Sequence, residues 1–553
     1  MKRFLYLFSL LVFTQATQLL AQTNDEALNG YIAKSPFPMP AVTVPVFQEK
    51  VFNIKDFGAV ADGKTLNTEA FAKAIAACVA AGGGKVLVPA GEWLTGPICL
   101  QSNINLHVEK GALIQFTKDR TQYPMIKAGK KSSNIVPASP IYGYDLKNIA
   151  ITGEGIIDGA GESWRPVKKA KASPGQWDAL IQSGGVLSAD GKIWWPSVEA
   201  LNGERFVQDF KASGKKPDAE NYLPARDFLR PYMLFLVNCE NILLEDVTIR
   251  NSPKFVFYPN RCRNLTMKRV NVFNEWWAQN GDGVDISACK NVIIYKCNVS
   301  CGDDAICMKS SQSSSDAPGY FALENILIAG CTVQRGHGGF VIGSNTDGGM
   351  QNIFVTDCNF EGTDIGIRIK SNAGRGGTVK DIYISNIGMK NIINEAILFD
   401  TYYADVPAGK TKQDDTTTLV QDKVPEFKDF HISNITCKGA MDAISITGLP
   451  QMPVHNIYFD KIDITSTRGM QAEYAANLFF DSVIIVPGSD PIFTISNVAG
   501  INIKNGFMPK NASTFIKANN KSSGINIEST NVGKADKSIK LDKSVDKNTV
   551  TIK

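Results

Sequence analysis

The sequence of 553 residues predicts an all-β chain whose strands coil into a solenoid. A short unit recurs along it: an apolar residue or cysteine, one variable residue, an asparagine or aspartate, and then alternating apolar residues. Between Asn241 and Asp381 the copies are 23, 27, 34, 27 and 29 residues apart. No segment with a helical period separates them, which disfavours an ordinary parallel sheet because such a sheet needs crossover helices. Coils whose strands pair with those of the next coil fit both observations.

The asparagine or aspartate of this unit is expected to mark one fixed turn of every coil. Its copies are Asn148, Asn241, Asn264, Asn291, Asn325, Asn352, Asp381, Asp429 and Asn456. Side chains at the same turn of successive coils would stack as a ladder, with the isoleucine and cysteine side chains stacked inside. A β-sandwich with coincidental spacing is the alternative interpretation.

The first 21 residues have the pattern of a cleaved signal peptide. Lys2 and Arg3 precede an apolar run from Phe4 to Phe13, and a cut near Ala21–Gln22 fits. A transmembrane anchor is the alternative, but the apolar run is too short to span a bilayer. With no cysteine near the cut for a lipid anchor, we expect a periplasmic or secreted protein without a membrane span.

Composition argues against several classes of function and site. A net charge of +4 gives no indication of nucleic-acid binding. No CxxC or HxxxH spacing predicts a zinc site, so we expect neither a metal nor another cofactor. One or two disulfides remain possible, but most of the eleven cysteines fall at recurring points of the repeat, as small buried side chains do. Those seven are Cys239, Cys262, Cys289, Cys297, Cys301, Cys331 and Cys358.

Residues 22–553 are expected to form a single domain with three departures from the repeat. A cap region at about 51–100 contains one clear helix, which starts at Asn67–Glu69, ends at Gly82–Gly84 and covers the first open coil. An insertion at about 159–230, rich in tryptophan and lysine, is either an excursion near the binding face or a packed surface lobe. The polar segment at about 514–553 is expected to be surface or a weakly ordered end.

Three carboxylates form the most informative motif. Asp282 lies in NGDG, and 21 residues later GDD provides Asp303 and Asp304. Carboxylates crowded together cannot all ionise easily, so one should keep its proton as a general acid while the others activate water. With no phosphate loop and no metal-ligand cluster, this pattern indicates hydrolysis of a glycosidic bond. A solvated turn is the alternative for GDD alone.

Two further motifs follow at the spacing of a coil. His337 in GHG lies 33 residues after Asp304, and Arg368 in RIK lies 31 residues after His337. We therefore expect all these groups on one face of adjacent coils. Arg368 and Lys370 share a face of a strand and suit a carboxylate, which suggests an acidic sugar. The alternatives are a plain turn histidine and a solubilising charge pair.

These motifs, in this order, resemble those of family 28 of the glycoside hydrolases, the polygalacturonase family, whose members carry NTD, GDD, GHG and RIK. The resemblance covers most of the chain and implies a right-handed parallel β-helix with a capping helix and a large loop insertion. It implies hydrolysis of α-1,4-galacturonosyl linkages with inversion and without a metal. Asp303 matches the general acid, while Asp282 and Asp304 match the pair that activates water.

The remaining site residues follow from the same resemblance. His337 matches the GHG histidine, and Arg368 and Lys370 match the cations that hold the galacturonate carboxylate. Asn280 matches the first residue of NTD and would contact substrate. Tyr402 resembles a downstream substrate-binding tyrosine, with Tyr403 as the alternative. Inversion further predicts acid and base carboxylates about 6.5–9.5 Å apart.

One position departs from the family pattern, because Gly281 stands where the usual motif has threonine. The RIK lysine argues against action on rhamnogalacturonan, although that substrate or a substituted pectin remains an alternative. The long insertion favours exo action from the non-reducing end over endo action, since it could close one end of the cleft. A calcium-dependent pectate lyase and a non-catalytic β-helix binding protein are more distant alternatives. The sequence leaves the oligomeric state open.

Overall fold

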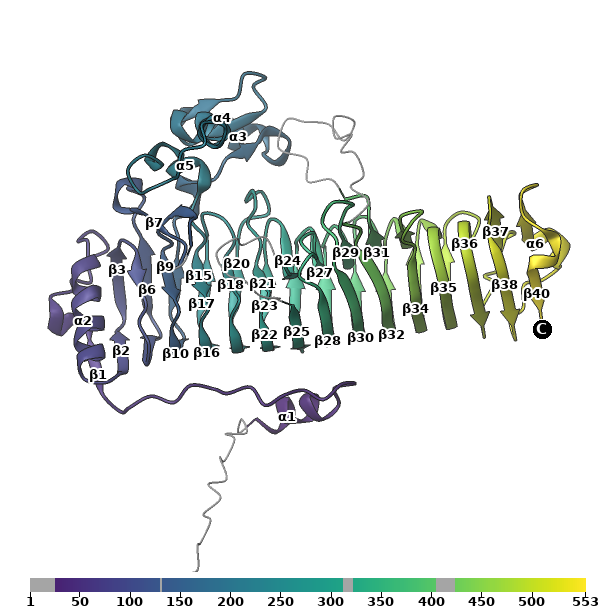
Figure 1. Cartoon of the computed structure of the whole chain (residues 1–553), viewed down its shortest axis with the longest axis horizontal. Coiled ribbons are helices and arrows are strands. Elements are labelled where there is room, and N and C mark those ends of the chain that lie inside the picture. The colour runs from purple at the N-terminus through teal and green to yellow at the C-terminus, as the bar shows by residue number, and fades with distance from the viewer. Residues whose placement is uncertain (1–24, 130–131, 312–321, 404–422) are drawn as a thin grey trace, which may run out of the picture.

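The computed structural model describes residues 25–129, 132–311, 322–403 and 423–553. The chain is an elongated right-handed parallel β-helix, as predicted, with three stacks of parallel strands along its length (Figure 1). The expected signal peptide lies outside the described residues. No helix in the described part of the chain is long and apolar enough to cross a membrane.

The first stack carries the motifs singled out above and is called the first face. Its short strands are β4 (Ile98–Cys99), β9 (Ile141–Tyr144), β15 (Leu234–Val237), β18 (Phe257–Asn260), β21 (Val284–Ser287), β24 (Asp304–Lys309), β27 (Gly338–Ile342), β29 (Ile367–Lys370), β31 (Glu395–Asp400), β33 (Asp442–Thr447), β37 (Ile516–Asn519) and β39 (Ile539–Leu541).

The second face carries the recurring unit. Its short strands are β1 (Val51–Asn53), β2 (Gly84–Val88), β5 (Ile104–Val108), β10 (Lys147–Thr152), β16 (Glu240–Glu245), β19 (Arg263–Lys268), β22 (Lys290–Tyr295), β25 (Leu323–Ala329), β38 (Ser523–Glu528) and β40 (Val550–Ile552). The third face consists of β3 (Gly91–Thr95), β6 (Ala112–Phe116), β11 (Ile156–Asp158), β17 (Thr248–Arg250), β20 (Asn271–Phe273), β23 (Asn298–Ser300) and β26 (Thr332–Gln334).

Towards the C-terminus the strands lengthen and bend from one face to the next. Those that run from the second face into the third are β28 (Met350–Glu361), β30 (Thr378–Lys390), β32 (Glu426–Lys438) and β34 (Val454–Ser466). β35 (Arg468–Pro487) continues from the first face through the others, and β36 (Phe493–Lys504) pairs on the first two. A separate antiparallel pair joins β7 (Met125–Lys127) to β8 (Ile135–Pro137).

The asparagine ladder is present. The amide of Asn264 donates to Asn241 Oδ1 at 3.0 Å and accepts from Asn291 Nδ2 at 3.1 Å. The contact repeats from Asn148 to Asn352, and Asn264 has a φ of 55°. Asparagine suits this turn because it tolerates a left-handed backbone and its amide can both donate and accept.

Inside the coils, residues of alternating strands form one continuous apolar core. Apolar pairs such as Ile242 and Leu265, or Ile353 and Ile382, face each other across neighbouring coils and are almost fully buried. The seven cysteines of the repeat are buried, as predicted, and all eleven cysteines are free thiols. The fold therefore rests on stacked apolar side chains rather than on disulfides.

The N-terminal end is covered as the sequence predicts. Helix α2 (Thr68–Ala80) follows the short helix η1 (Ile54–Phe57), buries Phe71, Ile75 and Cys78, and packs on the first coil. Helix α1 (Glu26–Ala33) was not predicted, and lies with the segment after it along the outside of the second face (Figure 1).

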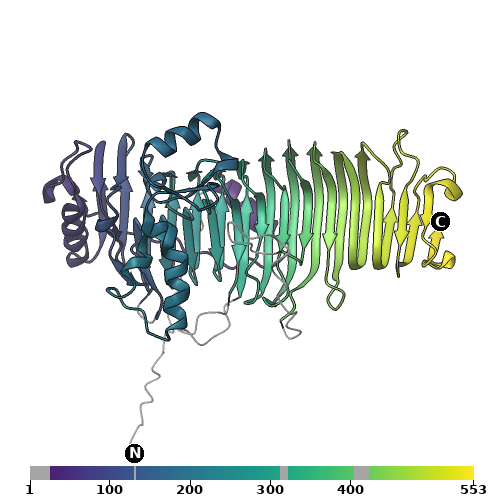
Figure 2. The same ribbon diagram turned by 90° about the horizontal axis from the view of Figure 1, so that it is seen from above.

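The insertion forms a lobe with cores of its own. It contains β12 (Val167–Lys168), β13 (Val186–Leu187), β14 (Ile193–Trp195), α3 (Pro174–Gln182), α4 (Val198–Ala212) and α5 (Arg226–Leu229), with the short helices η3 (Gly161–Ser163), η4 (Lys169–Lys171) and η5 (Leu223–Ala225); η2 (Arg120–Gln122) lies upstream. Figure 2 shows the lobe over the N-terminal coils. The insertion is thus a packed lobe, and it is also an excursion that reaches the first face.

The C-terminal segment continues the solenoid, so the expectation of a weakly ordered end is wrong. β37 to β40 pair with β36 and with each other, while α6 (Ala535–Ser538) and η7 (Lys547–Thr549) connect them. This segment forms strands because apolar and polar residues alternate along it. Ile516, Ala518, Ile525 and Ile527 point into the core between outward-facing polar residues that hid the pattern.

Candidate active site

The predicted site residues gather at one recurrent turn. In each coil this turn leads from a third-face strand into the next first-face strand. Residues 274–283 hold Asn280 and Asp282, residues 301–303 hold Asp303, and residues 335–337 hold His337. Stacking of the coils brings these turns side by side, and the lobe is inserted at the same place, between β11 and β15.

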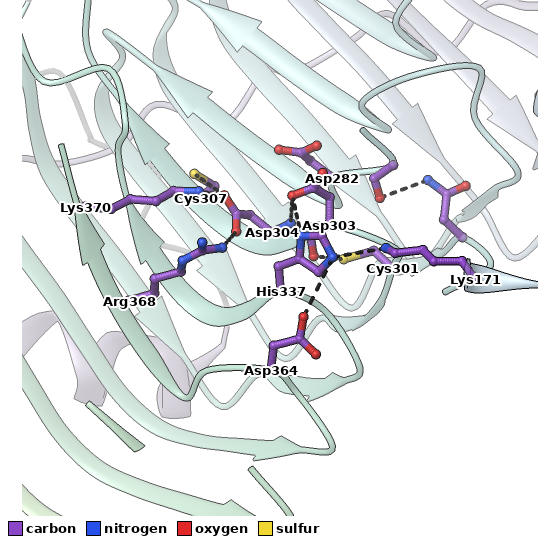
Figure 3. Close-up of polar contacts among 12 residues, drawn as sticks. Lys171, Asp282, Cys301, Asp303, Asp304, Cys307, His337, Asp364, Arg368 and Lys370 are labelled. Atoms are coloured by element: carbon purple, nitrogen blue, oxygen red, sulfur yellow. Dashed lines mark hydrogen bonds and ion pairs between the residues drawn. The ribbon is translucent and has the colours of Figure 1, made fainter. Parts of the chain in front are cut away.

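The three carboxylates lie together (Figure 3). One oxygen of each lies within 4.8 Å of the others. Asp282 and Asp304 are almost completely buried, whereas the Asp303 side chain is 19% exposed. Gly302 supplies the turn that lets adjacent aspartates share the site, as expected: a Cβ there would lie 2.6 Å from the backbone oxygen of Glu275. Asp303 is thus the carboxylate that a ligand can reach most easily.

Asp304 is held by both cations of the RIK motif. Arg368 Nη1 lies 3.0 Å from its Oδ1, and Lys370 Nζ lies 2.7 Å from its Oδ2. Burial opposes ionisation, but Lys370 and Arg368 outweigh it and hold the pKa of Asp304 well below its usual range. Asp304 is therefore an ionised carboxylate with both oxygens paired.

Asp282 is in the opposite electrostatic situation. Burial, and then the charges of Asp285 and Asp303, raise the pKa of Asp282 well above its usual range. Among the described residues, its Oδ1 is buried without a hydrogen-bond partner, and Lys309 Nζ lies 3.8 Å from its Oδ2. The raised pKa that a general acid needs therefore lies on Asp282, whereas the resemblance assigns that role to Asp303, whose pKa is lowered.

Asp303 accepts from the histidine. His337 Nδ1 lies 3.1 Å from Asp303 Oδ1, and this contact lowers the pKa of Asp303 although burial opposes the shift. On its other side, His337 Nε2 lies 3.1 Å from Lys171 Nζ, a residue of the lobe. A lysine ammonium can only donate, so Nε2 accepts and Nδ1 carries the proton that His337 donates to Asp303.

A second lobe residue holds Asn280. Arg230, at the end of α5, donates from Nη2 to Asn280 Oδ1 at 2.8 Å and from Nη1 to the backbone oxygen of Gln279 at 2.8 Å. Its backbone has φ 52° and ψ 132°, a conformation uncommon outside glycine. Arg165, also from the lobe and only 3% exposed, donates to Ser252 O at 2.6 Å. The lobe is thereby fixed to the turns that carry the site.

Close packing explains why glycine occupies position 281. A Cβ at this position would lie 2.7 Å from Ala278 Cβ and 2.9 Å from Ala278 O. Asn274 Nδ2 also donates to the Gly281 carbonyl at 3.1 Å. The turn is therefore packed too tightly here for the threonine of the usual motif.

Comparison with known proteins agrees with this arrangement. The profile of glycosyl hydrolases family 28 matches residues 216–479, and a profile described as rhamnogalacturonase A/epimerase, pectate lyase-like, matches residues 51–167. An exo-poly-alpha-D-galacturonosidase of Dickeya chrysanthemi is 30% identical over 81% of this chain and 74% of its own length. The chain belongs to family 28 of the glycosyl hydrolases. Neither profile match extends over residues 168–215, the greater part of the lobe.

Solved structures related to this glycosyl hydrolase share its fold. The exopolygalacturonase of Thermotoga maritima is 26% identical, with a TM-score of 0.63, and the match covers 87% of this chain and 96% of that one. The family 28 exopolygalacturonase of Yersinia enterocolitica is 22% identical, with a TM-score of 0.65 over 84% of this chain and 79% of that one. An endo-polygalacturonase of Pectobacterium carotovorum is 28% identical over 56% of this chain and 65% of its own length.

The tyrosine that lies against the cations of this glycosyl hydrolase is Tyr403. Lys370 Nζ is 4.6 Å from the centre of its ring, and Arg368 Cζ is 5.5 Å from it. Tyr402 is 49% exposed and pairs through its backbone with Asn372. The geometry therefore favours the alternative, Tyr403, over Tyr402 as the aromatic neighbour of the RIK pair.

Sequence reasoning missed a buried pair beneath the site. Lys309 Nζ lies 3.0 Å from Asp285 Oδ1, and burial raises the pKa of Asp285 to about 6 although Lys309 opposes the shift. Strand alternation could have found them, because both face outward on β21 and β24, the strands that follow Asp282 and Asp303. Lys171 and Arg230 had no such signal, since the lobe does not follow the repeat.

One oxygen of each of the three carboxylates lies within 4.8 Å of the others. Three acidic oxygens this close can also attract a metal ion. Here, however, Arg368 and Lys370 occupy both oxygens of Asp304, and Lys309 lies beside Asp282. These ammonium and guanidinium groups already supply the positive charge that an ion would bring.

Proposed function

We propose that this glycosyl hydrolase cleaves α-1,4-galacturonosyl linkages of pectin and removes galacturonic acid from the non-reducing end. The observation that carries the proposal is the contact of Arg368 and Lys370 with Asp304, inside a cluster of three carboxylates. A cationic pair beside hydrolytic carboxylates suits a substrate that is itself an acid. The names of the relatives from Dickeya chrysanthemi and Thermotoga maritima support the same substrate and exo action.

Asp303 is proposed as the general acid that protonates the leaving oxygen. It is the most exposed of the three carboxylates and is oriented by His337. Asp282, whose pKa is raised by burial and by the neighbouring carboxylates, has an oxygen within 4.8 Å of an oxygen of Asp303. A substrate carboxylate that draws Arg368 and Lys370 away from Asp304 would raise the pKa of the whole cluster. Asp303 can then hold a proton when the glycosidic oxygen arrives.

Asp282 and Asp304 are proposed to orient and deprotonate the attacking water. Asp304 is ionised and therefore acts as the base as soon as substrate occupies the cations. Arg368 and Lys370 would bind the galacturonate carboxylate, with the Tyr403 ring beside them. Asn280, fixed by Arg230, would contact the sugar on the side of Asp282.

Exo action is supported by where the lobe is attached. It is inserted ahead of the catalytic turns and is anchored to them through Arg165 and Arg230. The first face also carries a cluster of aromatic rings ahead of the catalytic turns. The rings of Phe235 and Tyr258 stack at 5.4 Å, and Tyr232 packs 4.6 Å from Tyr258. The lobe and these rings would limit how far a chain can extend along the first face.

Inversion remains part of the proposal, on the strength of the family resemblance alone. Proton NMR of the first product formed decides the point. We expect the β-anomer to appear first, whereas the α-anomer would indicate a covalent intermediate.

A product time course on homogalacturonan, with EDTA present, tests the function. We expect monomer from the first time point, little loss of viscosity, and no effect of the chelator. A ladder of oligomers would favour endo-polygalacturonase action, and dependence on calcium would favour a lyase. The Asp303→Asn variant should release no product, which separates hydrolysis from mere binding.

Export is also proposed, because residues 1–21 have the composition of a signal peptide. Fractionation of cells that produce the full chain, with N-terminal sequencing of the product, tests it. A periplasmic or extracellular protein that begins near Gln22 is expected. An uncut chain retained inside the cell would refute export.

A further inference from the structure

A cavity of about 470 Å³ opens between the lobe and the catalytic turns. Its volume is in the usual range of ligand sites, about 300–1,000 Å³. The residues that matter to the argument are Lys171, Trp276, Gly302, His337, Asp364 and Ile393. One wall therefore comes from the lobe, and the others come from five successive turns that follow third-face strands.

This cavity lies on the side of the proposed acid. Gly302 and His337 flank Asp303 in the sequence and in space, and His337 touches its carboxylate at 3.1 Å. The general acid protonates the oxygen of the departing sugar, so that sugar must lie beside Asp303. Trp276 and Ile393 are 41% and 58% exposed and offer apolar surfaces for a sugar ring.

Lys171 places an ammonium group in this cavity. Its Nζ lies 3.1 Å from His337 Nε2 and 6.0 Å from the centre of the Trp276 ring. Among the described residues it forms no ion pair, although the charges of Asp303 and Asp364 act on it. Burial lowers the pKa of Lys171. A part-buried ammonium whose partners are an imidazole and an indole can still accept an anionic ligand.

We propose that the cavity is the subsite for the galacturonate on the leaving-group side, and that Lys171 pairs with its carboxylate while Trp276 packs on its ring. The proposal rests on the proposed function and adds a specificity-determining residue to it. Arg368 and Lys370 do not line this cavity, so Lys171 would bind a different carboxylate from theirs. A neutral or esterified sugar at this subsite would lose the ion pair.

Two disaccharides that differ only in that carboxylate isolate the effect. Digalacturonate and galacturonosyl-α-1,4-galactose have leaving groups of similar basicity, so a change in acid catalysis alters both equally. We expect the wild type to prefer digalacturonate by about 10–100-fold in kcat/KM, the worth of one charged hydrogen bond. Lys171→Met should remove most of that preference and leave the galactose substrate within about threefold. Lys171→Arg should retain it.

Lys169→Met is the matched control, since Lys169 belongs to the same short helix and its ammonium lies 5.8 Å from the centre of the Trp177 ring, outside the cavity. It should behave as wild type. An equal loss on both disaccharides in Lys171→Met would overturn the proposal, because Lys171 would then act only through His337. The proposal would also be overturned if Lys171→Met left kcat/KM unchanged on both disaccharides. A wild type that cleaves neither galacturonide would instead refute the proposed function, on which the subsite depends.

Discussion

Lys370 Nζ lies 2.7 Å from Asp304 Oδ2, and both side chains are almost fully buried. Together with Arg368 on the other oxygen, this makes Asp304 the link between two cations and two neighbouring carboxylates. Lys370 and Arg368 lower the pKa of Asp304 in spite of its burial, whereas burial and the charges of Asp285 and Asp303 raise the pKa of Asp282. Loss of the carboxylate charge should therefore destabilise the fold at Asp304 and stabilise it at Asp282, although both changes should abolish activity.

Asp304→Asn should destabilise the fold as well as abolish activity. The change leaves Arg368 and Lys370 buried without a counter-charge, a loss of about 3–5 kcal/mol in the free energy of unfolding. The pKa of Asp304 is lowered on folding, so its stabilisation is present above the unfolded pKa, near 4, and is lost as pH falls through the folded value. Urea unfolding at neutral pH checks the prediction. Asp364→Asn, at a more exposed carboxylate, is the control and should change stability by less than about 0.5 kcal/mol.

Asp282→Asn should do the reverse and make an inactive protein more stable at neutral pH. The pKa of Asp282 is raised on folding, so its contribution favours the fold below the unfolded pKa and is lost as pH rises towards the folded value. An amide removes the repulsion from Asp285 and Asp303. Thermal melts over a pH series should show the gain shrinking towards about pH 4. A variant less stable than wild type at neutral pH would contradict this electrostatic account.

Asn264→Ala should cost about 3 kcal/mol in the free energy of unfolding. It removes two ladder contacts, to Asn241 and from Asn291, and places alanine at a φ of 55°. Asn264→Gly loses the same contacts without the backbone strain and should be about 1 kcal/mol less damaging. Denaturant unfolding of the two variants compares them. Equal losses would mean that the left-handed turn itself contributes nothing to the choice of asparagine.

Gly281→Thr should impair the enzyme instead of restoring a better site. The new Cβ would meet Ala278 Cβ at 2.7 Å and push the turn that carries Asn280 and Asp282. A loss of at least about tenfold in kcat/KM on a galacturonate oligomer is expected, as for a misplaced catalytic group. The double variant with Ala278→Gly relieves part of the contact and should recover part of the loss. A threonine variant with the kcat/KM of the wild type would show that the turn can shift to accommodate the side chain without loss of activity.

The solenoid and the first-face cluster were predictable because both follow the coil repeat. The ladder from Asn148 to Asn352 fixes where each coil turns, and that spacing places Asp282, Asp303 and His337 together. The C-terminal coils were not predicted, because the polar residues around Ile516 and Ile525 obscure the alternation of buried and exposed side chains.

The lobe contacts could not be predicted. Lys171 and Arg230 are placed by small cores, such as that of Trp177 and Trp194 packed on Trp277, which no periodic pattern encodes. The opposite pKa shifts of Asp282 and Asp304 also needed structure, since they depend on burial and on which aspartate the cations of β29 touch. Residue type alone does not distinguish the three aspartates from one another.

Cleavage of a hexagalacturonate labelled at its reducing end tests the central claim most directly. The account predicts labelled products that shorten one residue at a time, starting from the pentamer, with free galacturonic acid as the only unlabelled product. Asp303→Asn should leave the labelled hexamer intact. Labelled dimers and trimers at the earliest times, together with unlabelled oligomers, would contradict exo action and the closure of the cleft by the lobe.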